Sequence, residues 1–186
     1  AGSILTMTAD ANAIVAINGD YYTHRRYGPM VRNGVTYRME KSRTWDLCVL
    51  TYDGQLHTIQ FDSYTADSIA ALRPYQTWLF GPRLIADDGT AMTTFRSQVT
   101  PTNPRTVLGY YEPGHYAFLL VDGRQNDYSD GLNMQQLSKL CVELGFAAAY
   151  NLDGGRSSVM AGQSGFINKP FLNGRSITDI VYITDL

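Results

Sequence analysis

The sequence predicts a single α+β domain, a mixed α/β fold with a central mixed β-sheet, several β-hairpins and few helices. Short apolar segments of strand length are frequent, and Asn-Gly or Asp-Gly dipeptides separate several of them. A strand–helix–strand pattern occupies the C-terminal half. The 186 residues, 44% of them hydrophobic, suffice for one core but not comfortably for two. We therefore expect one domain over residues 1–186.

The first residues of the chain are expected to form a helix and a strand. A helix over residues 3–12 is expected to lead directly into a strand over 13–17. There is no initiator methionine and no signal peptide before it. We expect the domain to be excised from a longer protein.

The middle of the chain is rich in turn signals. Asn-Gly and Asp-Gly tolerate the positive φ angles that a type I′ turn needs. They predict turns at Asn33-Gly34, Asp53-Gly54 and Asp88-Gly89. The expected regular elements here are paired strands over 47–52 and 56–61, a helix over 65–72 ended by Pro74, and a strand over 76–80.

The C-terminal half has the pattern of a βαβ unit. An unbroken apolar run over 116–121 predicts a buried strand, and a second one follows over 147–152. Between them we expect a helix that is capped by Ser129 or Asp130 and ended by Gly145. A connection of this length makes the two strands parallel and the crossover right-handed.

Each of these two strands ends at an aspartate. Asp122 and Asp153 should project near one another, because parallel strands end on the same edge of a sheet, where ligands of open α/β sheets bind. Arg124 and Arg156 follow on the adjoining loops. Two carboxylates with two guanidiniums can supply proton transfer and an anion clamp. The alternative is that each Asp-Gly only makes a turn. We accept this alternative at Asp53 and Asp88, but we favour a role in the functional site for Asp122 and Asp153.

Two further segments have the character of site loops. An apolar strand runs into a small polar turn over residues 16–22, which is either a hairpin turn or a ligand loop. Pro104 fixes the backbone just before a strand begins at Thr106, so Arg105 enters on a stiff segment. Arg105 is either a surface charge or, as we favour, a ligand contact.

Charge and composition exclude several kinds of partner. The net charge of -2 gives no general attraction to nucleic acid or anionic membranes, and no apolar run is long enough to span a bilayer. The three histidines lack ligand spacing and no EF-hand pattern is present, so we predict neither a metal nor a cofactor. We favour two buried free thiols at Cys48 and Cys141, although a single disulfide would fit an exported protein.

Four ordered motifs carry a family resemblance. They are Ala16-Ile17-Asn18-Gly19-Asp20-Tyr21-Tyr22, Asn103-Pro104-Arg105-Thr106, Val121-Asp122-Gly123-Arg124 and Asn151-Leu152-Asp153-Gly154-Gly155-Arg156-Ser157-Ser158. Together they resemble the phosphodiester glycosidase domain family, which includes the lysosomal uncovering enzyme and exported bacterial relatives. Arg156 departs from the family pattern, which usually has a third glycine there. Family members also usually have further strand-forming sequence ahead of the first motif.

The resemblance implies hydrolysis of a sugar-1-phosphodiester of the N-acetylglucosamine type between the anomeric carbon and the phosphate oxygen. Asp153 and Asp122 are the implied catalytic carboxylates, as nucleophile, base or cation stabiliser in an undecided order. Arg105 and Arg124, with Arg156 as an addition, would bind the phosphate, while Asn18 and Tyr21 would line the sugar side. The remaining implied substrate contacts are Gly19, Thr106, Gly154, Gly155, Ser157, Ser158 and Asn168.

Two other functions stay open at this point. The same tyrosines, arginines and strand-end turns would serve a module that binds glycan or cell-wall polymer without cutting it. A phosphodiesterase that cleaves the P–O bond is the second alternative. The resemblance also implies a carbohydrate or phosphoglycan partner and an extracellular or cell-surface location, with no role in nucleic-acid binding and no integral membrane segment.

Overall fold

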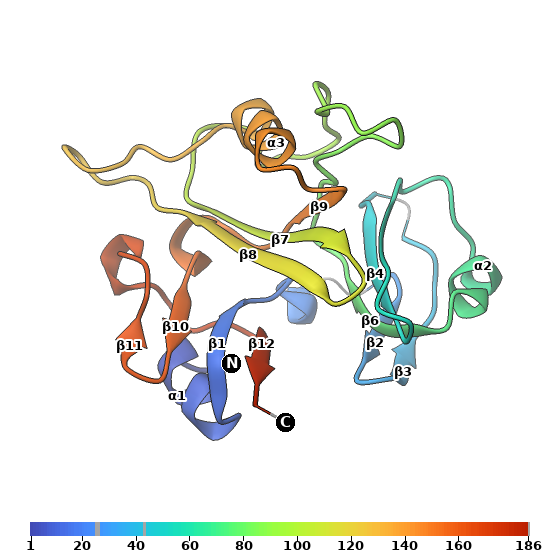
Figure 1. Cartoon of the computed structure of the whole chain (residues 1–186), viewed down its shortest axis with the longest axis horizontal. Helices are drawn as coiled ribbons and strands as arrows, with labels where there is room; N and C mark the ends of the chain where they lie inside the picture. The colour runs from blue at the N-terminus through green and yellow to red at the C-terminus, as the bar shows by residue number, and fades with distance from the viewer. Residues whose placement is uncertain (25–26, 43, 186) are drawn as a thin grey trace.

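The computed structural model describes residues 1–24, 27–42 and 44–185 and confirms the α+β class (Figure 1). The strands of these residues form four small sheets in place of one central mixed sheet, and every pair of named strands is antiparallel. The first sheet has the order β11-β10-β1-β12, and the others are β2-β3, β5-β4-β6 and β8-β7-β9. A mixed sheet does not form because the two parallel strands of the predicted βαβ unit are not neighbours.

The sheet around β1 (Ala13–Asn18) joins the two ends of the chain. Its partners are β10 (Met160–Gly162) and β12 (Ile180–Thr184), and β11 (Gly165–Phe166) extends it. The helix α1 (Ile4–Asp10) is capped by the Ser3 side chain and packs on this sheet (Figure 1). The helix and strand predicted at the start of the chain are confirmed.

All three predicted turns form, but among them only Asn33-Gly34 has positive φ at both residues. Asn33 and Gly34 have φ of 51° and 76°, as a type I′ turn requires, and join β2 (Met30–Arg32) to β3 (Val35–Arg38). Gly54, with φ of 83°, lies in the turn between β4 (Leu47–Thr51) and β5 (Leu56–Ile59). At the third turn, Gly89 has φ of 81° and Ile85 bridges Ala91.

The helix and strand that follow differ from expectation only at their ends. Thr65 caps α2 (Ala66–Ala71) in a capping box with Ser68. The next strand, β6 (Pro74–Trp78), begins two residues earlier than predicted, because proline is tolerated as the first residue of a strand.

The fourth sheet, β8-β7-β9, carries the predicted strand–helix–strand unit. In it β8 (His115–Val121) and β9 (Ala148–Asn151) both pair antiparallel with β7 (Arg105–Glu112). The two outer strands are therefore parallel to each other but separated by β7. The helix α3 (Met134–Glu143) connects them (Figure 1).

The cap predicted for this helix was wrong at its start and right at its end. Asn133 caps the helix in a capping box with Gln136. Ser129 instead donates to the carbonyl of Asp122, which keeps it in the preceding loop. Gly145, with φ of 78°, follows the helix as predicted.

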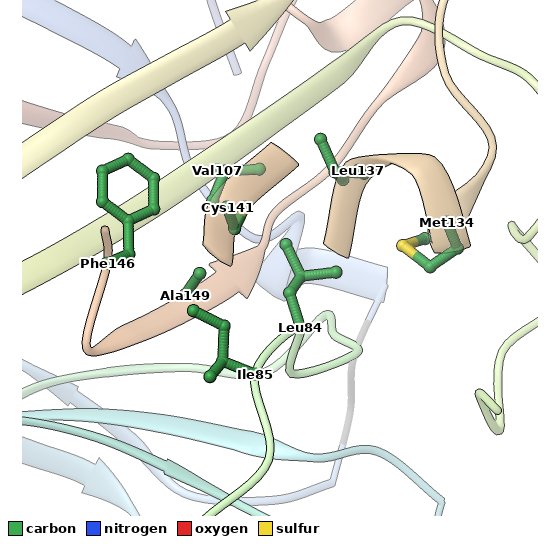
Figure 2. Packing of buried hydrophobic residues seen from close by; sticks show 8 residues of the cluster. All are labelled: Leu84, Ile85, Val107, Met134, Leu137, Cys141, Phe146 and Ala149. Atoms are coloured by element: carbon green, nitrogen blue, oxygen red, sulfur yellow. The ribbon is translucent and has the colours of Figure 1, made fainter. Parts of the chain in front are cut away.

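Successive residues of the β7 sheet point into two different cores. One face packs under α3, where Val107 and Ala149 meet Leu137 and Cys141 (Figure 2). The other face, through Leu108 and Tyr150, packs against residues from the sheets of β1 and β4. The sheet is thus a middle layer with apolar packing on both faces, and its buried positions lie in β7 and β9.

Cys48 and Cys141 lie in these two different cores as free, buried thiols, which confirms the favoured reading. Burial raises the pKa of Cys141 to about 12 and that of Cys48 well above its ordinary value. Neither thiol is therefore an ionised nucleophile near neutral pH.

Candidate active site

The predicted site loops converge at one edge of the β7 sheet. Arg105 pairs with Val121 at the end of β8, and Val107 pairs with Asn151 at the end of β9. The loops after β8 and β9 therefore flank the start of β7, with the two strands about 10 Å apart. The end of β1 joins them, because the Gly19 carbonyl accepts a hydrogen bond from the Asp153 N–H.

Asp153 is the carboxylate at the centre of this edge. Its side chain is largely buried, and one oxygen accepts the N–H of Gly154 at 2.9 Å. The other oxygen accepts Arg175 Nη2 at 2.8 Å. Arg175 Nε donates to Ser157 Oγ at 2.6 Å, so one guanidinium holds both side chains in place.

Asn18 fixes the backbone behind Asp153. The Asn18 side chain is almost fully buried and donates to the Asp153 carbonyl at 2.7 Å. Its amide oxygen accepts Thr106 Oγ1 at 2.8 Å and the Val159 N–H at 3.3 Å. The side chain thus ties the ends of β1, β7 and β9 together, and Thr106 supports it.

The two glycines of the motif allow close approach of neighbouring groups. A Cβ on Gly154 would lie 2.9 Å from the Pro104 carbonyl oxygen. Gly155 has φ of 63°, and a Cβ there would lie 3.1 Å from Arg124 Nη2. The guanidinium of Arg124 therefore sits directly against the backbone of the loop that follows Asp153.

Two exposed arginines stand beside this loop. Arg124 itself has a positive φ of 57°, and its Nε donates to Asn103 Oδ1 at 2.9 Å. Arg156 is also exposed, and its Nε donates to the Gly174 carbonyl at 2.7 Å. Both guanidiniums are anchored on one side and accessible to solvent, as an anion-binding position requires.

The ring of Tyr21 lies next to the guanidinium of Arg175. The guanidinium carbon of Arg175 is 5.0 Å from the centre of the Tyr21 ring, which stacks on His24 at 3.8 Å. Tyr21 has φ of 62°, so its place next to Arg175 depends on an uncommon backbone conformation.

Arg105 occupies a different environment from the other arginines. It is 1% exposed, and its guanidinium donates to the Leu132 carbonyl at 2.9 Å, the Val99 carbonyl at 2.6 Å and the carbonyls of Thr100 and Pro101. Burial lowers the pKa of Arg105 to about 10, and the positive charge of Arg124 adds to the effect. In this structure its donors face the backbone of residues 99–101 and 132, not an open site.

Asp122 is surrounded by hydrogen-bond donors. Its oxygens accept Asn168 Nδ2 at 2.7 Å, the Lys169 N–H at 3.0 Å and the Tyr128 hydroxyl at 3.0 Å. Asn168 in turn accepts the Met160 N–H at 2.8 Å. Asp122 and Asn168 together fix the segment after β11 against the end of β8.

A partly buried ion-pair cluster supports the β1 end of the site. Arg32 Nη2 contacts Asp20 Oδ1 at 3.0 Å and Asp179 Oδ2 at 3.2 Å. Asp20 also accepts the Leu79 N–H at 2.7 Å. The Gly19 N–H donates to the Asp179 carbonyl at 3.0 Å, so the cluster sets the position of the Asn18-Gly19 turn.

Gly19 has no room for a side chain, because a Cβ there would lie 2.2 Å from Asp179 Oδ2. We expect Gly19→Ala to displace this carboxylate from Arg32 and to lower the free energy of unfolding by about 2–4 kcal/mol, measured by urea denaturation. Shortening Asp179 to alanine should remove most of the added cost in the double variant. Equal costs of Gly19→Ala in both backgrounds would contradict the steric explanation.

The carboxyl of Asp179 should make folding pH-dependent. Burial, reinforced by the negative charge of Asp20, raises its pKa to about 6 although Arg32 opposes the shift. The folded state then holds this proton at pH values where the unfolded chain has lost it, so its contribution to stability is present below pH 4 and is lost as the pH rises towards 6. We expect the stability of the wild type to fall relative to Asp179→Asn by up to about 1.4 kcal/mol per pH unit in this window. Denaturant curves at matched pH values test it; a constant difference would contradict it.

Sequence reasoning missed Arg175, which forms the ion pair with the Asp153 carboxylate. It lies on the loop after the 3-10 turn η3 (Phe171–Asn173), and no strand end or repeated pattern marks it. The dipeptide Asn173-Gly174 before it was the available signal, since both residues adopt positive φ and turn the loop back towards β9. Ser158, in contrast, was among the substrate contacts that the family resemblance implied. Its buried hydroxyl has no hydrogen-bond partner among the described residues.

Over the described ranges, no cluster of three or more histidine, cysteine or acidic side chains is placed to hold a metal ion. Among the same residues no helix is long and apolar enough to cross a membrane.

Three proteins that resemble this chain are distant from it in sequence. The chain is 26% identical over 173 residues to the SPbeta prophage-derived uncharacterized protein YomE of Bacillus subtilis (strain 168), and it spans 27% of the length of that protein. Its structure is similar, with a TM-score of 0.78 and 20% identity, to the zebrafish N-acetylglucosamine-1-phosphodiester alpha-N-acetylglucosaminidase catalytic domain auto-inhibited by pro-peptide, covering 100% of this chain and 68% of that one. A hypothetical protein from Synechocystis is similar with a TM-score of 0.65 and 14% identity, covering 96% of this chain and 53% of that one.

The family model for phosphodiester glycosidase matches residues 11–184, which include all four sequence motifs and Arg175. The structural likeness supports the same assignment of fold. The chain therefore belongs to the phosphodiester glycosidase family.

Proposed function

We propose that this chain is a hydrolase that cleaves the anomeric C–O bond of a sugar-1-phosphodiester of the N-acetylglucosamine type. The observation that carries the proposal is the Asp153 carboxylate, held by Arg175 and the Gly154 N–H at the edge where four loops meet. A carboxylate beside several guanidiniums suits a reaction in which positive charge develops on a sugar carbon and negative charge on a phosphate.

The leaving group explains the choice of residues. A phosphate monoester departs readily, so the site needs less help from a general acid than an ordinary glycosidase does. Binding of the phosphate matters more. Arg124 and Arg156 are exposed and anchored, and Arg175 could exchange its contact with Asp153 for a phosphate oxygen. In this proposal the three guanidiniums bind the phosphate, and Asp153 faces the anomeric carbon as nucleophile or cation stabiliser.

The other predicted residues receive supporting roles in this proposal. Asn18 and Thr106 position the backbone of Asp153, and Ser157 orients Arg175. Tyr21 offers a ring edge to the sugar. Asp122 acts through Asn168 on the segment after β11, and Arg105 keeps the 99–101 segment in place.

The substrate would be a carbohydrate or phosphoglycan outside the cell, since such polymers carry sugar phosphodiesters on the surface. The family resemblance supports export of the whole protein. The net charge of -2 gives no support to a nucleic-acid substrate.

Hydrolysis of methyl N-acetylglucosamine-1-phosphate in ¹⁸O-labelled water tests the proposal. We expect turnover with the label on the anomeric hydroxyl of the sugar, because C–O cleavage delivers the water oxygen to carbon. Label in the phosphate would assign a phosphodiesterase instead. Binding of the diester without turnover would assign a non-catalytic module.

A further inference from the structure

A groove separate from the Asp153 edge lies between β12 and the strands β2, β3 and β6. Its volume is about 630 Å³. Neither Asp153 nor any of the exposed arginines beside it lines this groove. In Figure 1, β12 and the β2–β3 hairpin stand on the two sides of this region.

The walls of the groove carry flat aromatic side chains from several elements. Tyr37 of β3 is 66% exposed and Tyr182 of β12 is 45% exposed. Tyr22, Tyr75 and Trp78 add further aromatic surface to the lining. Exposed rings on opposite walls are the surface on which the C–H faces of sugars stack.

The polar groups in the groove are fixed in place. Arg32 is held by Asp179 and Asp20, and Gln76 Nε2 donates to Asn33 Oδ1 at 2.6 Å. Such preset donors and acceptors suit hydroxyl and acetamido groups. Among the described residues that line the groove, Arg32 and Asp179 carry opposite charges and form an ion pair.

The groove adjoins the candidate active site through three successive residues. Asp20 belongs to the Arg32 cluster at the groove, Tyr21 lies under Arg175, and Tyr22 lines the groove with Arg32 5.8 Å from its ring centre. A chain bound along the groove would therefore run towards the Asp153 edge past the turn after β1.

We propose that this groove binds a neutral stretch of the glycan chain that carries the phosphodiester. The inference rests on the proposed function for the identity of that chain, while the binding itself requires no turnover. A groove of this volume accommodates an oligosaccharide of a few units, and its aromatic rings and preset polar groups suit such a chain.

Calorimetric titration with chitotetraose, cellotetraose and maltotetraose tests the proposal, using the Asp153→Asn variant so that no probe can be consumed. We expect at least one tetrasaccharide to bind, and Tyr37→Ala and Tyr182→Ala each to weaken that binding by about 3–10-fold. Tyr27→Ala is the matched control, because Tyr27 is also 66% exposed but does not line the groove.

The outcomes separate this inference from the catalytic one. Turnover of methyl N-acetylglucosamine-1-phosphate should stay unchanged when the groove tyrosines are replaced in the otherwise unaltered chain, since this short diester does not reach them. Failure of all three tetrasaccharides to bind would overturn the groove assignment, as would an equal effect of Tyr27→Ala. If a strand-forming peptide bound to β12 and the tetrasaccharides did not bind, the groove assignment would also be overturned.

Discussion

Replacing Asp153 by asparagine should lower kcat/KM for methyl N-acetylglucosamine-1-phosphate by at least about 10³-fold. The substitution keeps the shape of the side chain and an oxygen that can accept the Gly154 N–H, but it removes the negative charge that the proposed reaction places beside the anomeric carbon. Because Asp153 pairs with a partly exposed Arg175, the loss of charge should change the thermal midpoint little.

Asp122→Asn is the matched control for this prediction. Its oxygens accept Asn168, Lys169 and Tyr128, so we expect this variant to lose stability more than activity. Rates measured at saturating substrate distinguish the two carboxylates. An inactive Asp122→Asn beside an active Asp153→Asn would reverse their roles in the proposed mechanism.

Replacing Arg105 by methionine should be among the most destabilising single changes in the chain. The buried guanidinium donates to four backbone carbonyls, and an apolar side chain of similar length leaves all of them without these donors. We expect a loss of about 3–5 kcal/mol in the free energy of unfolding, measured by urea denaturation.

Arg124→Met provides the comparison. This arginine is exposed and bonds the side chain of Asn103, so its removal should cost less than about 1 kcal/mol of stability. In the proposed mechanism it should instead raise KM for the phosphodiester. If Arg105→Met kept full stability while losing affinity for the phosphodiester, Arg105 would be a ligand contact after all.

Local signals in the sequence predicted local structure well. Asn33-Gly34 and Asp53-Gly54 identified their hairpins, because positive φ at Asn33, Gly34 and Gly54 strongly restricts these turns. Signals within one segment could not identify partners far away in the chain. The strand β12 pairs with β1, and the chain crosses β7 through α3 to reach β9. The strands therefore separate into small sheets, and no short sequence motif predicts this arrangement.

The candidate site was predictable where strands end in polar turns, as at Asn18, Asp122 and Asp153. The contacts of each side chain were harder to predict from the sequence. Arg105 and Arg124 both follow short polar turns in the sequence, yet one is enclosed by carbonyl groups and the other faces solvent. That difference depends on how residues 99–101 fold over β7, which is a tertiary property.

The pairing of β1 with β12 also has a consequence for how the molecule forms. Asn18 lies opposite Ile180, and on its other edge β1 pairs with β10, so both neighbours of this apolar strand come from the C-terminal part of the chain. During synthesis β1 leaves the ribosome long before its partners do, and loop closure over such a separation is slow. The nascent chain should therefore expose an unpaired apolar strand until β10 and β12 have been synthesised, and during that interval it is a substrate for chaperones.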